Sequence, residues 1–184
     1  MFFLILLNLS AQSKLTDPRD GNTYQTISVS GTIWMAENLR YKGNGGTVSG
    51  FDNNSDNIAA YGVLYDWKSA KNACPDGWHL PSDAEFRSLM DLSEINHNGA
   101  SQKSGPSTFR VQLAGMQDYE GTFSELDESA YYWTSTEYNA TEAEYFSYMV
   151  INDKPVIDLS RKTDMPDIHG AEKTNRYSVR CVKN

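Results

Sequence analysis

Cysteine and histidine are scarce in this chain of 184 residues, which contains 2 Cys and 3 His. The histidines, His79, His97 and His169, have neither a His-x-x-x-His nor a Cys-His spacing, so the sequence predicts no metal site of the zinc type. Cys74 and Cys181 are too far apart for a Cys-x-x-Cys redox motif, which leaves a catalytic or redox pair as the minor alternative to a structural disulfide. We therefore expect no metal and no cofactor.

Positive charge is also in short supply, with 16 Lys and Arg against 24 Asp and Glu, a net charge of −8. Nucleic-acid binding needs clustered Lys and Arg that neutralise phosphates, so we expect no nucleic-acid partner. An acidic surface that keeps an extracellular protein soluble is the simpler interpretation. The longest apolar run is too short to cross a bilayer, so we expect no integral membrane span.

The first residues, 1–11, combine a short apolar run with small residues after it. This pattern is typical of the core and cleavage region of a secretory signal peptide, with cleavage after Ala11. No basic segment precedes the run, which is consistent with a truncated signal, and no cysteine stands nearby to carry a lipid anchor. The alternative is an apolar N-terminal strand of a cytosolic protein. Export is favoured, and it makes Cys74 and Cys181 a disulfide instead of two free thiols.

Aromatic residues are abundant, at 12 % with 11 Tyr and 4 Trp, which favours strands and a core of large rings. The length supports one domain. Turn residues at 20–22 and at Gly31 bound runs of β-formers and predict an opening hairpin. Residues 144–151 are largely apolar or aromatic on both faces, so we expect a central strand there. The predicted strands are residues 23–29, 32–35, 109–113, 121–123, 130–137, 144–151 and 177–182.

Two helices are predicted between the hairpin and the later strands. Asp66 can cap the first, and the Pro-Asp-Gly run at 75–77 ends it. Ser82 and Glu85 form a capping box that starts the second. Their inner faces are expected to comprise Trp67, Ala70 and Cys74 in the first helix and Phe86, Leu89 and Met90 in the second.

Three polar segments lack periodicity and are expected to be exposed connections. In the first of them, residues 52–56 place oxygen ligands at alternating positions, as the first half of a calcium loop does. Asn57 stands where such a loop requires Gly and Val63 where it requires Glu, so a solvated linker is the favoured interpretation. The three segments are residues 42–57, 94–107 and 154–173.

Aromatic side chains on loops are the candidates for ligand contacts, and we predict this role for Tyr119, Tyr131 and Tyr138. The four tryptophans stand within regular elements or beside a cysteine or turn, so we assign them to the core. The acid pairs at 127–128 and at 142 and 144 are interpreted as solvated charges, because two acids without a recognisable cleft do not make a glycosidase. No Gly-x-Ser-x-Gly elbow marks a serine nucleophile, and no catalytic residue is predicted.

Six short blocks of sequence follow one another across the chain and are more specific together than any one of them alone. They are Asp20-Gly21-Asn22-Thr23-Tyr24, Trp34-Met35-Ala36-Glu37-Asn38-Leu39, Gly62-Val63-Leu64-Tyr65-Asp66-Trp67, Cys74-Pro75-Asp76-Gly77-Trp78-His79-Leu80-Pro81, Tyr132-Trp133-Thr134-Ser135-Thr136-Glu137 and Ser178-Val179-Arg180-Cys181-Val182.

Together these blocks, over residues 17–183, resemble the Fibrobacter succinogenes major paralogous domain family. The resemblance implies an α+β, C-type-lectin-like fold: a looped antiparallel sheet flanked by two helices, with the terminal strands side by side. In that fold a helix-borne cysteine bonds one in the last strand, which implies the pair Cys74 and Cys181. Members of the family are typically exported by Bacteroidetes and Fibrobacteres, often to the cell surface.

Calcium-dependent sugar binding in true C-type lectins uses a Glu-Pro-Asn or Gln-Pro-Asp loop and a Trp-Asn-Asp strand. The chain has no such loop and reads Trp133-Thr134-Ser135 at the equivalent strand, so the calcium mechanism is not expected.

The function predicted is a secreted or cell-surface binding or adhesion module without enzymatic activity, whose partner is a glycan or a cell-surface protein. One alternative is a structural or assembly component of the envelope. Another is an oxidase similar to formylglycine-generating enzymes, which share the Cys-Pro-x-Gly-Trp-x-Leu-Pro element. Such an oxidase needs a pair of free thiols, whereas the predicted disulfide uses both cysteines.

Overall fold

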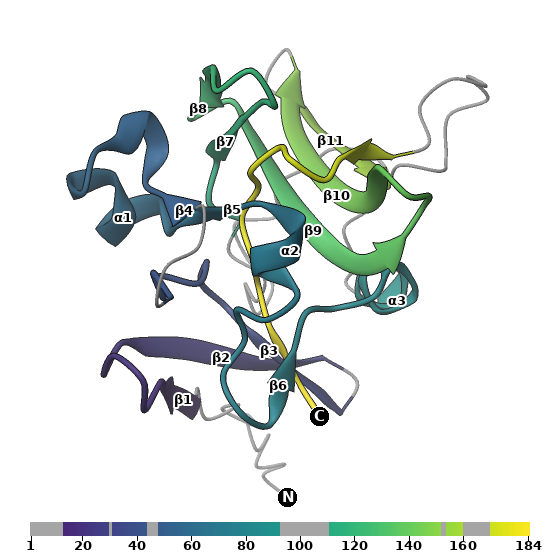
Figure 1. Cartoon of the computed structure of the whole chain (residues 1–184). Helices are drawn as coiled ribbons and strands as arrows, with labels where there is room; N and C mark the ends of the chain where they lie inside the picture. Colours follow the sequence, from purple (N-terminus) through teal and green to yellow (C-terminus); the bar gives the residue numbers. More distant parts are fainter. Residues whose placement is uncertain (1–12, 30, 44–47, 93–110, 152–153, 160–169) are drawn as a thin grey trace, which may run out of the picture.

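The computed structural model of the chain describes residues 13–29, 31–43, 48–92, 111–151, 154–159 and 170–184. Over these residues the fold is mixed α+β, with most regular structure in curled sheets and only short helices (Figure 1). Within the same residues, no helix combines the length and apolar character needed to cross a bilayer.

The first sheet has five strands in the order β1-β2-β3-β13-β6. Its antiparallel β2–β3 pair, which aligns Ile27 with Trp34 and Val29 with Thr32, is the predicted opening hairpin and is confirmed. Gly31 in the connecting turn has φ +89°, a conformation that glycine adopts without steric cost. The strands are β1 (Ser13–Thr16), β2 (Thr23–Val29), β3 (Thr32–Met35), β6 (Trp78–His79) and β13 (Val182–Lys183).

The second sheet has the order β11-β10-β9-β7-β8, and β12 also pairs with β10. The predicted central strand is confirmed, because β10 lies between β9 and β11. Of the segment 154–173, expected to be a connection, residues 154–159 instead form β11. Of the strand expected at 109–113, residues 111–113 are described and are not strand, and β7 begins at Ala114. The strands are β7 (Ala114–Gln117), β8 (Phe123–Leu126), β9 (Ser129–Glu137), β10 (Glu142–Ile151), β11 (Lys154–Leu159) and β12 (Ala171–Glu172).

The segment 42–57, also expected to be an exposed connection, contains regular structure in its described part. Buried Phe51 explains this, because its ring packs against Phe123 at a centroid distance of 5.2 Å and anchors an otherwise polar run. Residues 52–56, whose spacing resembles half of a calcium loop, run from a short 3₁₀ helix to the start of the helix that follows it. The elements are β4 (Val48–Ser49), paired with β5 (Leu64–Tyr65), the 3₁₀ helix η1 (Phe51–Asn53) and α1 (Asp56–Tyr61).

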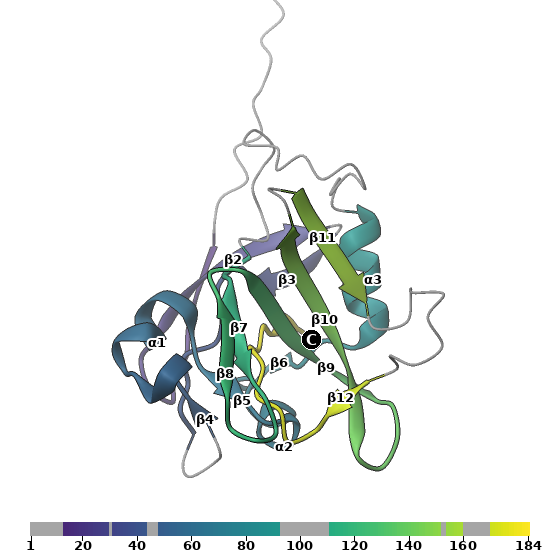
Figure 2. The same cartoon turned by 90° about the horizontal axis from the view of Figure 1, so that it is seen from above.

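Both predicted helices form, and both caps are confirmed. The carboxylate of Asp66 accepts from the Ser69 backbone N–H at 2.7 Å and starts α2 (Trp67–Ala70). That helix is shorter than expected and ends before Cys74. At α3 (Asp83–Leu92), Glu85 accepts from the Ser82 backbone N–H at 2.7 Å, as a capping box requires. Figures 1 and 2 show α1 and α3 on opposite sides of the molecule.

Aromatic rings fill the core, as the composition predicted. Three of the tryptophans are buried, whereas Trp78 is only half-buried. The indole N–H of Trp133 donates to the Tyr65 carbonyl at 2.7 Å, which satisfies the polar end of a buried ring. Around α3, Phe86 stacks on Phe146 of β10 at a centroid distance of 5.2 Å and so fixes the helix on the second sheet.

The C-terminal segment, residues 176–184, joins the sheets (Figure 1). The backbone of Tyr177 exchanges two hydrogen bonds with Tyr65 in β5, at 2.8 and 3.0 Å. The N–H of Ser178 donates to the Tyr131 carbonyl of β9 at 2.9 Å. After this contact with the second sheet, β13 pairs with β3 and β6 of the first. The predicted last strand, 177–182, is therefore a connector that becomes regular strand only at its end.

A disulfide between Cys74 and Cys181 joins the C-terminal segment to the chain just after α2, across a sequence separation of 107. The predicted pairing is thus confirmed in the structure. In the chain-entropy description, a bond across so long a loop stabilises the fold mainly by restricting the unfolded chain.

We expect the double variant C74A/C181A to lose about 4 kcal/mol of unfolding free energy, because the unfolded chain regains the conformations that the crosslink excludes. Urea denaturation of the wild type and the variant measures this loss. Wild type unfolded with a reductant should match the variant, and equal midpoints for oxidised wild type and variant would contradict the stabilising role.

Candidate functional site

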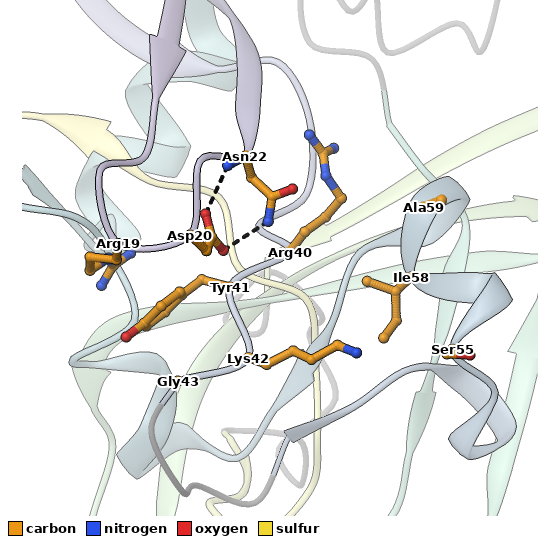
Figure 3. Close-up of a pocket in the computed structure, with 10 residues that line it drawn as sticks. All are labelled: Arg19, Asp20, Asn22, Arg40, Tyr41, Lys42, Gly43, Ser55, Ile58 and Ala59. Carbon is orange, nitrogen blue, oxygen red and sulfur yellow. Dashed lines mark hydrogen bonds between the residues drawn. The ribbon is translucent and has the colours of Figure 1, made fainter.

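A polar groove of about 580 Å³ lies between three segments that are far apart in the sequence (Figure 3). The turn at 19–22, between β1 and β2, lies on one side, and Ser55 with α1 lies on the other. Residues 40–43, which follow β3, run between them, and Figure 3 shows the side chains of Tyr41 and Lys42 along this middle segment. The groove therefore exists only once the first sheet and α1 are assembled.

Arg19 fixes the first side of the groove. Its guanidinium donates to both carboxylate oxygens of Asp17, at 2.9 and 2.7 Å, and to the Ala73 carbonyl at 2.7 Å. The same group lies 3.7 Å above the ring centroid of Tyr41. Burial alone would raise the pKa of Asp17, but the hydrogen bonds from Arg19 outweigh it and lower that pKa. The turn is thus tied to the segment that carries Cys74.

Arg40 is anchored in a similar way. Its Nη1 donates to Glu37 at 2.8 Å, and its guanidinium lies 4.5 Å from the ring centroid of Tyr24. The Tyr24 hydroxyl accepts from the backbone N–H of Arg40 at 3.0 Å. Burial raises the pKa of Tyr24 to about 12, so this hydroxyl stays protonated at neutral pH. Both arginines of the groove therefore already have a carboxylate partner and a ring.

Lys42 differs from the two arginines. Its side chain is exposed, and within the described residues its ammonium has no ion-pair partner. A second hollow of about 240 Å³ adjoins the first, and Lys42, Ser55 and Ile58 line both. Lys42 therefore lies where the two hollows meet. The second continues toward β4 and Asn53.

Asp20 and Asn22 supply hydrogen-bond acceptors to the groove. The Asn22 backbone N–H and side-chain amide donate to the two Asp20 oxygens at 2.9 and 2.8 Å, as Figure 3 shows. These bonds set the turn and leave the amide oxygen of Asn22 without a donor among the described residues. With the Lys42 ammonium, the Ser55 hydroxyl and the Tyr41 ring, the groove offers acceptors, donors and an aromatic surface. Such a mixture suits a ligand rich in hydroxyl groups.

The three tyrosines predicted as ligand contacts lie in different settings. Tyr119 and Tyr138 are exposed, at 65 % and 39 %, and their predicted role stays a prediction because neither lines the groove. The expectation of a loop position for Tyr131 is wrong: it lies in β9, is 8 % exposed, and its hydroxyl donates to Glu125 at 2.7 Å. Burial raises its pKa, and the Glu125 carboxylate adds to the rise.

Sequence reasoning assigned 20–22 to a turn and 42–57 to a linker, and so missed the groove. No spacing rule connects residues that meet only through a sheet and a helix. The run Arg40-Tyr41-Lys42 was the available signal, because two cations around an aromatic ring stand out in a chain of net charge −8.

Other titratable groups have structural roles. His79 contacts Glu85 at 2.9 Å and Asn184 at 2.6 Å, beyond its own turn, and the other two histidines lie outside the described residues. Glu144, expected to be a solvated charge, is buried in β10 instead. Among the residues that the structure describes, no group of three His, Cys, Asp or Glu side chains is placed to hold a metal ion.

We expect D17N to lower the unfolding free energy at neutral pH by about 2 kcal/mol, because the Arg19 guanidinium loses its charged acceptor. The lowered pKa of Asp17 means that its contribution is present above the unfolded value, about 3.9, and is lost as pH falls through the folded value. As pH is lowered, the unfolding free energy of the variant should therefore fall less steeply than that of the wild type. Urea denaturation across that pH range measures both effects. The exposed-carboxylate variant D76N is the control, and coincident profiles for D17N and wild type would contradict the assignment.

Comparison with known proteins identifies a family for the chain. No curated protein and no solved structure matches the chain. The family model described as the Fibrobacter succinogenes major domain matches residues 27–183, which include all of the second sheet, α1 to α3 and both cysteines. Since this match covers most of the sequence, the chain belongs to the Fibrobacter succinogenes major domain family.

Proposed function

We propose that this protein is an exported, non-enzymatic binding module, secreted or at the cell surface, which holds a glycan in the groove between residues 19–22, 40–43 and α1. The observation that carries the proposal is the lining of the groove. It combines the Asp20 carboxylate, the Lys42 ammonium and the Tyr41 ring in one open hollow. Sugars present hydroxyl groups that donate and accept, together with apolar ring faces, so each type of lining group has a partner.

Export is supported by the disulfide between Cys74 and Cys181. Disulfides persist in oxidising compartments and are rare in reducing ones. The apolar run in residues 1–11 has the pattern of a signal peptide, which agrees with this.

A C-type-lectin-like scaffold is part of the proposal. Three features favour it: the last strand, β13, pairs with β3 of the opening hairpin, two capped helices precede the second sheet, and the disulfide joins the end of the first helical region to the C-terminal segment. In such a scaffold the sheets hold loops in place, and the loops carry the ligand contacts.

The disulfide also favours a binding role over the oxidase alternative. An oxidase of the formylglycine-generating type needs two free thiols, whereas the sulfurs of Cys74 and Cys181 are bonded to each other. Intact-mass measurement with and without reduction before alkylation tests this point. Alkylation of both cysteines in the native protein, together with copper binding, would favour the oxidase.

We expect A59W to abolish glycan binding, because Ala59 is exposed on α1 and lines the groove, so an indole there fills the hollow without disturbing the core. A glycan array probed with the purified protein identifies the ligand, and titration calorimetry compares the variants. A84W, which places the same ring on the exposed face of α3, is the matched control and should bind as wild type does.

Binding should persist in the presence of a chelator, because the proposed contacts use no metal. Wild-type protein that binds no glycan on the array would overturn the proposal and favour an envelope structural role. Binding that A59W leaves intact would place the glycan site elsewhere, with Tyr119 and Tyr138 the next side chains to replace.

A further inference from the structure

We infer that the ligand is an acidic oligosaccharide that extends through both hollows and presents a carboxylate or sulfate to Lys42 where they meet. This inference rests on the proposed function and names the ligand class for the same groove. Its two parts, the acidic group and the extended form, come from different observations.

The charge of the groove points to an acidic ligand. Arg19 and Arg40 are each paired with a carboxylate, at 2.7 and 2.8 Å, so their charges are neutralised within the protein. Among the residues that the structure describes, the Lys42 ammonium has no such partner, and no carboxylate lines the second hollow. An anionic group on the ligand would provide the counterion that Lys42 lacks, through a charge-assisted hydrogen bond.

The shape of the groove points to an extended ligand. The hollows of about 580 and 240 Å³ share Lys42, Ser55 and Ile58, so a chain that lies in one can continue into the other past these side chains. A single sugar bonded to Lys42 could contact only the part of each hollow nearest the junction. An oligomer would add contacts toward Asp20 at one end and toward Asn53 at the other.

The acceptors of the groove favour a saccharide over an acidic peptide. Asp20 and the amide oxygen of Asn22 accept hydrogen bonds, and they line the same hollow as Lys42. Ionised aspartate and glutamate side chains accept hydrogen bonds but donate none, so they would give the Asp20 carboxylate no partner. A uronic acid or sulfated sugar carries hydroxyl donors beside its acidic group, so it can satisfy Lys42 and Asp20 at once.

The experiment compares defined ligands by titration calorimetry on the full chain. The probes are trigalacturonate, its methyl ester, monomeric galacturonate, a sulfated trisaccharide and an oligoglutamate peptide. We expect trigalacturonate to bind roughly tenfold more tightly than its neutral ester, the effect of one partly exposed charged hydrogen bond. We expect it to bind more tightly than the monomer as well, since only the trimer reaches both hollows. Tighter binding of the sulfated probe would identify sulfate as the group at Lys42.

Variants test separately the role of Lys42, at the junction of the hollows, and the role of the second hollow. K42M should remove the preference for the acid over the ester and the weakening of acid binding by salt, while K42R should keep both. K68M, which removes an exposed lysine on α2 outside the groove, is the matched control. N53D places a carboxylate in the second hollow at a position with φ 55°, which Asp and Asn both tolerate, and should weaken the trimer but not the monomer.

The outcomes separate this inference from the proposed function. Equal binding of acid and ester by the wild type, or an unchanged preference in K42M, would overturn the acidic class and leave a neutral glycan in the groove. Equal binding of monomer and trimer, or an N53D variant that matches wild type, would overturn the extended form. Binding of oligoglutamate in place of every sugar would overturn both the saccharide and the proposed glycan function.

Discussion

The C-terminal segment is the constraint on which the rest of the structure depends, because residues 176–184 bond to every sheet. The backbone of Arg176 bonds to Gln117 of β7 at 2.8 and 3.1 Å, that of Tyr177 bonds to β5, and β13 completes the first sheet between β3 and β6. A sheet hydrogen bond is worth little alone, but these bonds also bury the Tyr177 ring against Trp133, at a centroid distance of 4.4 Å. The two sheets therefore pack around the same C-terminal segment, and both contribute residues to the same hydrophobic clusters.

The disulfide extends this constraint to the groove. Cys181 in the C-terminal segment is bonded to Cys74, and the carbonyl of Ala73 beside it accepts a hydrogen bond from Arg19. Arg19 in turn supports the Tyr41 ring in the middle of the groove. A continuous series of covalent, polar and ring contacts thus runs from the core connector to the candidate site. Open groove walls hold their geometry through such contacts, since they bury too little apolar surface to do so by packing.

The sequence correctly predicted the elements that are determined by residues close together in the chain. The Asp66 cap, the capping box of Ser82 and Glu85, and the hairpin around Gly31 each depend on residues within a few positions of one another. The predictions were wrong for segments whose structure is determined by contacts with residues far away in the sequence. Residues 154–159 become β11 because they pair with the edge of β10, and residues 48–57 contain regular structure because Phe51 is buried. Tyr131 is buried because Tyr177, from the far end of the chain, stacks on it at 5.2 Å. The groove is the extreme case, since three separate segments form it.

The distribution of charge explains why the groove, and not the exposed tyrosines, is the stronger candidate site. A chain of net charge −8 as a whole repels an acidic partner. Among the described residues that line the groove, Arg19, Arg40 and Lys42 are cations and Asp20 is the one acid. Asp17 and Glu37 pair with the two arginines and hold them in place. The arginines therefore stabilise the walls of the groove, and Lys42 provides the positive charge for a ligand. Tyr119, by contrast, follows Asp118 and precedes Glu120, so it offers a ring without a cation beside it in sequence. The proposed acidic group would meet the Lys42 ammonium in a groove whose turn is held in place by the Arg19 hydrogen bonds, and such a combination of charge and preorganisation favours selective binding.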